Sequence, residues 1–261
     1  MFLSAADLPR VSSLIFDYKR NSAYLDFLKN NVKDKVIVDC GSGSGIWTWV
    51  SLYYGASHVY AVDIDLETVD HLNKLFGNNK NVTVLNLNLH ADMLPVGDIY
   101  VHEMFGDNIF SEGLMRFLKN CHKQNIKTIY PNKIKLFSLT NLTSENLNNK
   151  YNFKNLDPCL NEFVEYISET YNRPVEKESF IKLLYSKKVT ANKNLIWEGD
   201  LMSLVDMPSI KSAGDFISWD ACLNEFEYSS LNENFNNWPT GYVKSKEFQH
   251  SYINCHRTSY Y

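Results

Sequence analysis

The chain has no large excess of charge, no paired cysteine motif and no long apolar run. Its 26 basic and 30 acidic residues leave a net charge of −4 over 261 residues, so we expect no nucleic-acid surface. The five cysteines form no C-x-x-C pair and no Cys/His cluster at metal-ligand spacing, which predicts reduced thiols, a cytoplasmic protein and no metal. We expect no membrane span, and no signal peptide in the opening residues, MFLSAADLPRV.

Residues 36–63 carry the strongest pattern in the chain. They suggest a strand, a glycine turn, a helix and a second strand that ends on Asp63, and Asp39 stands just before the turn. The turn contains Gly41, Gly43 and Gly45. Glycine lets the backbone approach a ligand where a Cβ would collide, and an acid about 20 residues later can accept the ribose hydroxyls. The G-x-G-x-G spacing differs from that of pyrophosphate binders, so we predict another nucleotide in a Rossmann-like site.

Strand and helix patterns alternate over residues 36–118, which predicts a mostly parallel, doubly wound sheet. Strand formers dominate after about Pro131. The elements expected there are helices at 159–170 and 177–184 and extended segments at 188–190, 195–204, 216–228 and 251–255. We therefore predict an α/β protein. A Rossmann-like domain with N-terminal helices would span residues 1–131, and a smaller, mostly β, barrel-like substrate domain would span residues 132–261.

Two carboxylates, Glu103 and Glu112, flank the loop MFGDNIFS after a predicted strand at 99–101. Without a cation they would repel each other, and one of them would tend to take up a proton. Together they can bind a planar, permanently charged guanidinium through bidentate hydrogen bonds. Glu112 alone has a second explanation, because the helix dipole favours an acid near a helix N-terminus.

These stretches resemble the protein arginine N-methyltransferases. Asp39 and the glycine turn look like motif I of class I S-adenosylmethionine-dependent methyltransferases, and EMFGDNIFSEG (103–113) looks like the family's double-E loop. DYKRNSAY (17–24) resembles the helix before motif I in the divergent branch that contains the monomethylating, type III enzyme. YPNKIKLF (130–137) is similar to the strand that leads out of the family's Rossmann domain.

The resemblance implies methyl transfer from S-adenosylmethionine to arginine in a protein or peptide, with Glu103 and Glu112 as the catalytic pair. The residues implied at the cofactor are Arg20, Asp39, Gly41, Gly43, Gly45, Asp63 and His90. Arg20 would bind the methionine carboxylate; its other explanation is an exposed helix arginine. The substrate-side candidates are Asp107, Trp219 and His250, and His250 is also explained as a surface histidine.

Departures from the family pattern keep other interpretations open. His90 stands where an adenine-binding acid is expected, so Asp92 or a backbone group can serve instead. The family's Thr-His-Trp loop has no clean counterpart beyond Trp219-Asp220, and a shortened or relocated dimerisation arm near 141–176 leaves a homodimer open. The alternatives are a methyltransferase acting on a small amine or RNA, and a non-catalytic scaffold.

Overall fold

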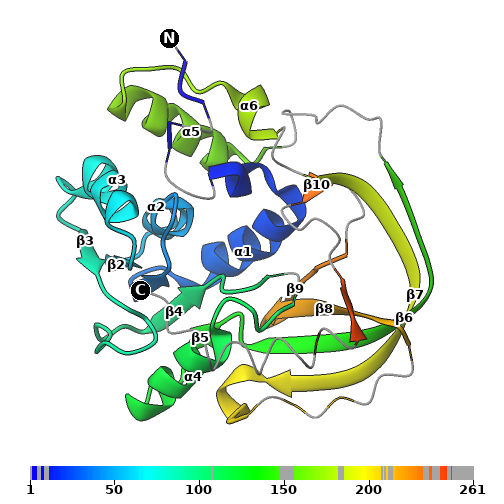
Figure 1. The fold of residues 1–261 in the computed structure, drawn as a ribbon. Helices are drawn as coiled ribbons and strands as arrows, with labels where there is room; N and C mark the ends of the chain where they lie inside the picture. Colours follow the sequence, from blue (N-terminus) through cyan, green and yellow to red (C-terminus); the bar gives the residue numbers. More distant parts are fainter. Residues whose placement is uncertain are drawn as a thin grey trace. The chain divides into compact units, whose positions relative to one another are not determined.

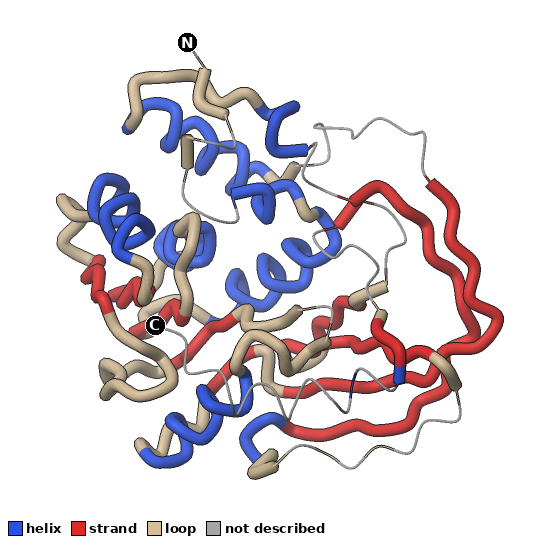
Figure 2. Tube along the Cα trace, in the orientation of Figure 1, coloured by secondary structure: helices blue, strands red, loops and turns tan. Residues whose placement is uncertain are grey.

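The chain folds into two compact units, each built from two separate segments (Figures 1 and 2). Unit 1 comprises Met1–His102 and Lys150–Leu184, and unit 2 comprises Glu103–Asn149 and Tyr185–Tyr261. The structure is a computed structural model. It describes residues 2–4, 7–8, 12–106, 108–146, 156–181, 185–206, 208, 210, 214–231, 235–236, 242–245 and 248.

A parallel sheet forms the centre of unit 1, with the strand order β3-β2-β1-β4. The strands are β1 (Val36–Cys40), β2 (His58–Asp63), β3 (Val82–Asn86) and β4 (Ile99–His102). Ile37 and Val38 are fully buried, as expected of a parallel strand covered on both faces. All four strands run the same way, so their carboxyl ends share one edge, where ligands bind in such sheets. The predicted Rossmann-like arrangement is confirmed.

The helices of unit 1 come from both of its segments. They are α1 (Tyr18–Asn31), α2 (Ile46–Tyr53), α3 (Leu66–Phe76), α5 (Pro158–Thr170), α6 (Lys177–Ile181) and the 3-10 helix η1 (Ser12–Phe16). Side-chain caps define several starts: Asp65 accepts a hydrogen bond from the amide of Thr68 at 3.1 Å, for example.

Helix α5 packs on α2 through Trp49. The indole ring of Trp49 stacks on Phe163 and Tyr166, and its Nε1 donates to the carbonyl oxygen of Cys159 at 3.1 Å. Of the arm expected near 141–176, residues 156–176 therefore belong to unit 1, whereas residues 141–146 are part of strand β6 in unit 2. A homodimer stays a prediction.

Unit 2 contains an antiparallel sheet in the order β10-β7-β6-β8-β11, with β9 paired to β8. Its strands are β6 (Lys133–Asn146), β7 (Tyr185–Asp200), β8 (Phe216–Leu223), β9 (Phe226–Ser229), β10 (Phe235–Asn236) and β11 (Val243–Lys244). Strands β6 and β7 are long and curved (Figure 2). Their pairing shifts register at Leu136/Phe137 and at Thr140/Thr143, and such irregularities bend a strand. Helix α4 (Leu114–Lys123) and the short β5 (Ile129–Tyr130) precede the sheet.

Several expected boundaries differ from the observed ones. The runs expected at 188–190 and 195–204 are a single strand, β7, followed by the 3-10 helix η3 (Leu201–Ser203). The run expected at 216–228 is a hairpin, β8 and β9, which turns at Asn224 with φ of +56°. The segment expected at 251–255 lies outside the described residues.

The units also divide at His102 rather than at residue 131. Contacts within unit 2 explain this: Trp219 Nε1 donates to the carbonyl oxygen of Gly106 at 3.0 Å, and His122 Nε2 lies 2.6 Å from the carbonyl oxygen of Met202. The loop after β4 and helix α4 are thereby joined to the later strands.

Candidate cofactor site and carboxylate pair

The glycine turn joins β1 to α2 at the carboxyl edge of the parallel sheet. Gly41, Gly43 and Gly45 have φ of +78°, +51° and +80°, values that other residues rarely adopt. A Cβ at Gly45 would also lie 2.7 Å from Cε2 of Phe76. The amides of Gly41 and Ser42 both donate to the carbonyl oxygen of Val62 at 2.9 Å, which fastens the turn to β2.

Asp63 ends β2 beside this turn. Its Oδ2 accepts a hydrogen bond from the amide of Gly43 at 3.1 Å, and its Oδ1 accepts one from the amide of Asp65 at 3.0 Å. An ionised carboxylate offers about four acceptor sites, so two remain for a ligand. Asp63 is therefore suited to bind a pair of hydroxyl groups.

Asp39 is a buried acid at the end of β1, with 1% of its surface exposed. Its Oδ2 accepts a hydrogen bond from Oγ1 of Thr48 at 2.6 Å, and its Oδ1 has no hydrogen-bond partner in the described part of the chain. Burial raises the pKa of the carboxyl to about 6. Sequence reasoning missed Thr48, whose only signal is a hydroxyl in the first turn of the helix after the glycines.

Arg20 is buried within unit 1, with 1% of its surface exposed, so the alternative of an exposed helix arginine is wrong. Its Nη2 donates to the carbonyl oxygen of Leu14 at 2.7 Å and to Oδ1 of Asn21 at 2.9 Å. Its guanidinium carbon lies 5.5 Å from the ring centre of Trp47, and that ring stacks on Tyr24 at 4.3 Å. No sequence motif predicts the aromatic wall that Trp47 and Tyr24 form beside Arg20.

His90 lies half-buried in the loop after β3, and its amide donates to Oδ1 of Asn88 at 2.9 Å. Asp92, the alternative to His90, is exposed and accepts a hydrogen bond from the amide of Asn88 at 2.7 Å. In the same loop, just before His90, Cδ1 of Leu89 lies 4.0 Å from where a Cβ on Gly41 would stand. This loop therefore borders the glycine turn, and unit 1 contains every cofactor candidate.

The carboxylate pair belongs to unit 2. Glu103 follows β4 directly in the chain and is half-buried, and Glu112 stands before Gly113, the N-cap of α4. Surrounding protein raises the pKa of Glu112 to about 7, and the charge of Glu103 adds to this effect. Glu112 as a whole is nevertheless an exposed residue, so the raised pKa reflects protein packed around the carboxyl and not complete removal from water. The helix dipole would lower this pKa, so the dipole is not the main influence on Glu112.

Trp219 lies beneath the loop that joins the two glutamates. It is 1% exposed, its ring centre lies 5.2 Å from that of Phe105, and its Nε1 binds the carbonyl of Gly106. The indole therefore supports this loop from β8. The other substrate-side candidates, Asp107 and His250, lie outside the described residues.

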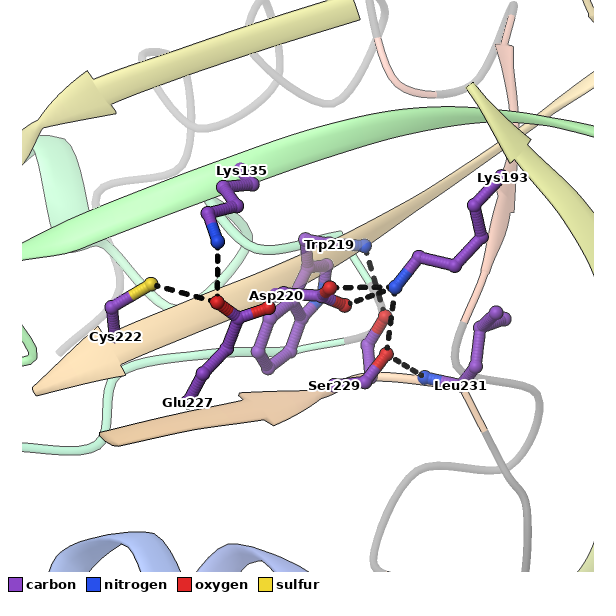
Figure 3. Close-up of polar contacts among 9 residues, drawn as sticks. Lys135, Lys193, Trp219, Asp220, Cys222, Glu227, Ser229 and Leu231 are labelled. Atoms are coloured by element: carbon purple, nitrogen blue, oxygen red, sulfur yellow. Dashed lines mark hydrogen bonds and ion pairs between the residues drawn. The ribbon is translucent and has the colours of Figure 1, made fainter. Parts of the chain in front are cut away.

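Asp220, next to Trp219, is paired with a lysine (Figure 3). Nζ of Lys193 lies 2.7 and 2.6 Å from the two carboxylate oxygens and 4.1 Å from the ring centre of Phe137. Asp220 is 4% exposed, so Lys193 neutralises a buried charge. Nearby, Lys135 binds Glu227, whose Oε2 lies 3.6 Å from Sγ of Cys222.

The described part of the chain contains no group of three histidine, cysteine or acidic residues placed to hold a metal ion. None of its helices is both long enough and apolar enough to cross a membrane.

The arrangement of unit 1 defines a class: a Rossmann-like methyltransferase fold, joined here to an antiparallel β unit. In agreement, residues 23–131 match the family of the ribosomal protein L11 methyltransferase (PrmA). A probable protein arginine N-methyltransferase 1.2 of Arabidopsis thaliana is 30% identical over 109 residues, which are 39% of this chain and 30% of that protein. The chain thus matches under a third of that relative's length.

Solved structures extend the likeness to most of the chain. Protein arginine methyltransferase 10 of Arabidopsis thaliana covers 89% of this chain and 80% of its own, at a TM-score of 0.56 and 16% identity. PRMT6, crystallised with SAH, covers 92% of this chain and 89% of its own, at a TM-score of 0.54 and 14% identity. The chain therefore has the fold of the protein arginine methyltransferases, as the sequence motifs predict.

Proposed function

We propose that this protein transfers a methyl group from S-adenosylmethionine to a guanidinium nitrogen of arginine in a protein or peptide. The observation that carries the proposal is the pair Glu103 and Glu112 at the two ends of one loop; burial first, and then the charge of Glu103, raise the pKa of the Glu112 carboxyl to about 7. Two carboxylates in this relation are suited to a permanently charged guanidinium. The sequence likeness to an arginine N-methyltransferase supports the same substrate class.

The residues of unit 1 fit this cofactor. The buried cation Arg20 suits the carboxylate of an amino acid, and the open acceptor sites of Asp63 suit a ribose. The buried, open acceptor of Asp39 suits a cationic ligand. His90 or Asp92 would face the adenine. When bound, S-adenosylmethionine supplies an electrophilic methyl group on a sulfonium cation.

The glutamates would act through charge and orientation. Glu103 and Glu112 would accept hydrogen bonds from the guanidinium and hold its plane fixed, which lowers the entropic part of the barrier. Binding of the cation would favour the ionised form of Glu112. A carboxyl with a pKa of about 7 is also suited to receive the proton that the guanidinium nitrogen loses on methylation. No covalent link to the enzyme is required.

Two finer expectations belong to the same proposal. Residues 17–24 resemble the divergent branch that contains the monomethylating enzyme, and analysis of the product would decide whether one or two methyl groups are added. Self-association is a separate expectation, and sedimentation of the purified protein would test it.

Transfer of labelled methyl groups to an arginine-glycine peptide tests the proposal. A lysine-glycine peptide of the same length serves as the control acceptor. Glu198→Gln, which replaces an exposed glutamate on β7, serves as the control variant and should leave transfer unchanged. Glu103→Gln and Glu112→Gln should each lower transfer by about 100-fold or more. Both variants should bind S-adenosylhomocysteine as the wild type does. Unchanged transfer in Glu103→Gln would overturn the proposal.

A further inference from the structure

A buried histidine connects the glycine turn to the end of helix α5. His71 lies on α3 with 4% of its surface exposed. Its Nε2 is 3.3 Å from the carbonyl oxygen of Ser44, and its Nδ1 is 2.6 Å from the hydroxyl of Tyr171. A carbonyl can only accept, so Nε2 carries the proton and Nδ1 accepts from the tyrosine. Burial lowers the pKa of His71, which favours this neutral ring.

Tyr171 is itself held in place. It caps the C-terminus of α5, where its amide donates to the carbonyl oxygen of Ile167 at 3.0 Å. Nζ of Lys74, from α3, lies 3.6 Å from the centre of its ring. The hydroxyl that reaches His71 therefore comes from a residue fixed by both helices.

The carbonyl that His71 binds is at a sensitive point of the turn. Ser44 is 4% exposed, and its carbonyl immediately precedes Gly45, whose φ of +80° begins α2. A buried carbonyl that loses its donor is costly. The hydrogen bond from His71 thus fixes the peptide plane between Ser44 and Gly45. Two peptide units earlier in the same turn, the amide of Gly43 donates to Asp63, so a change at the Ser44–Gly45 peptide can reach this cofactor candidate.

We propose that His71 and Tyr171 are positioning residues that hold the glycine turn in its ligand-binding conformation through the carbonyl of Ser44. Helix α5, which enters unit 1 from a distant part of the chain, is thereby part of the cofactor site. The identity of the ligand rests on the proposed function, whereas the effect on the turn does not. Since neither residue contacts reacting atoms, cofactor affinity changes and the rate at saturating cofactor does not.

Hydrogen exchange in the ligand-free protein tests the effect on the turn. Four of its amides donate hydrogen bonds and serve as reporters: Gly41, Ser42, Gly43 and Gly45. Tyr171→Phe removes the hydroxyl and keeps the ring beneath Lys74. The matched control is Tyr53→Phe, which removes a hydroxyl that binds Glu162 of α5 at 3.2 Å.

Tyr171→Phe and His71→Phe should speed exchange of these amides by about 5- to 10-fold, as for the loss of one buried hydrogen bond. Tyr53→Phe should leave them unchanged. His71→Gln, which keeps an N–H donor and an acceptor, should restore part of the protection. The proposal would be overturned if these amides exchanged at the same rate in Tyr171→Phe and His71→Phe as in the wild type. It would also be overturned if Tyr53→Phe accelerated their exchange as much as Tyr171→Phe does.

Calorimetry and kinetics give the functional measurement. Tyr171→Phe should weaken S-adenosylhomocysteine binding and raise the KM for S-adenosylmethionine by the same 5- to 10-fold, with kcat unchanged. A lower kcat with an unchanged KM would contradict a positioning role. Failure of the wild type to bind S-adenosylhomocysteine would count against the proposed function alone, because the exchange experiment still decides the role of His71 and Tyr171.

Discussion

Replacing Asp39 with asparagine should remove a pH-dependent loss of stability. The pKa of this buried carboxyl is raised from 3.8 to about 6, chiefly because burial disfavours its charge. Between these values the folded protein keeps a proton that the unfolded chain has released. The free energy of unfolding therefore falls as the pH rises from about 4 to about 6, and the full cost of the charge is present above that range.

The size of the effect follows from the shift. A difference of about two pKa units corresponds to about 3 kcal/mol once Asp39 is fully ionised. About 2 kcal/mol of this cost develops between about pH 4.5 and 7.0. Asparagine does not titrate. The free energy of unfolding of Asp39→Asn, relative to that of the wild type, should therefore rise by about 2 kcal/mol from pH 4.5 to pH 7.0. Its unpaired amide adds a cost that does not depend on pH.

Urea unfolding of both proteins across this pH range measures the difference, and Asp26→Asn, on the exposed face of α1, serves as the matched substitution. A difference that stays constant within about 0.5 kcal/mol would refute the reasoning, because it would mean that the fold imposes no cost on the ionised carboxyl. Asp39→Asn should also bind S-adenosylmethionine more weakly, since a neutral amide does not attract a cationic ligand.

Three further predictions concern packing and charge. Gly45→Ala should destabilise the protein by about 2 kcal/mol, measured in urea, because of its φ of +80° and the contact of the new Cβ at 2.7 Å. Lys193→Met should cost about 3 kcal/mol in the same assay, since it leaves Asp220 buried without a cation. Carbon NMR should find Glu112 titrating near pH 7, with a lower midpoint in Glu103→Gln.

Each of these has a matched control. Gly55→Ala has a similar φ of +88° but its nearest neighbour is 3.7 Å away, so it should cost less than Gly45→Ala. Adding Asp220→Leu to Lys193→Met should restore much of the lost stability, and no recovery would contradict the argument from an unpaired charge. An unchanged Glu112 midpoint in Glu103→Gln would show that the two carboxylates do not interact.

The parallel sheet could be predicted because its signals are local. Val36 to Asp63 contains strand, turn, helix and strand in sequence, and helix α3 is bounded by its cap Asp65 and by Gly77. The full length of strand β7 is harder to predict from the sequence, because residues 192–194 contain two asparagines, which disfavour strands. They pair with residues 138–140 of β6, and this tertiary pairing overrides their local preference.

The rest of the site depends on contacts that no local pattern records. His71 and Tyr171 are 100 residues apart in the sequence, one on α3 and the other at the end of α5. Lys193 and Asp220 likewise come from two different strands, β7 and β8. The burial of Arg20 is similar, since it depends on Trp47 from the next helix. Motif spacing could indicate Arg20 by resemblance, but only the fold reveals its aromatic wall.

The central claim is that arginine receives the methyl group. The most direct test is to incubate the protein with labelled S-adenosylmethionine and an arginine-glycine peptide, hydrolyse the product to amino acids and separate them by chromatography. The account predicts that the label elutes with a methylated arginine carrying the group on its guanidinium. Label on lysine, on an amine or on RNA added to the same reaction, with none on arginine, would contradict it.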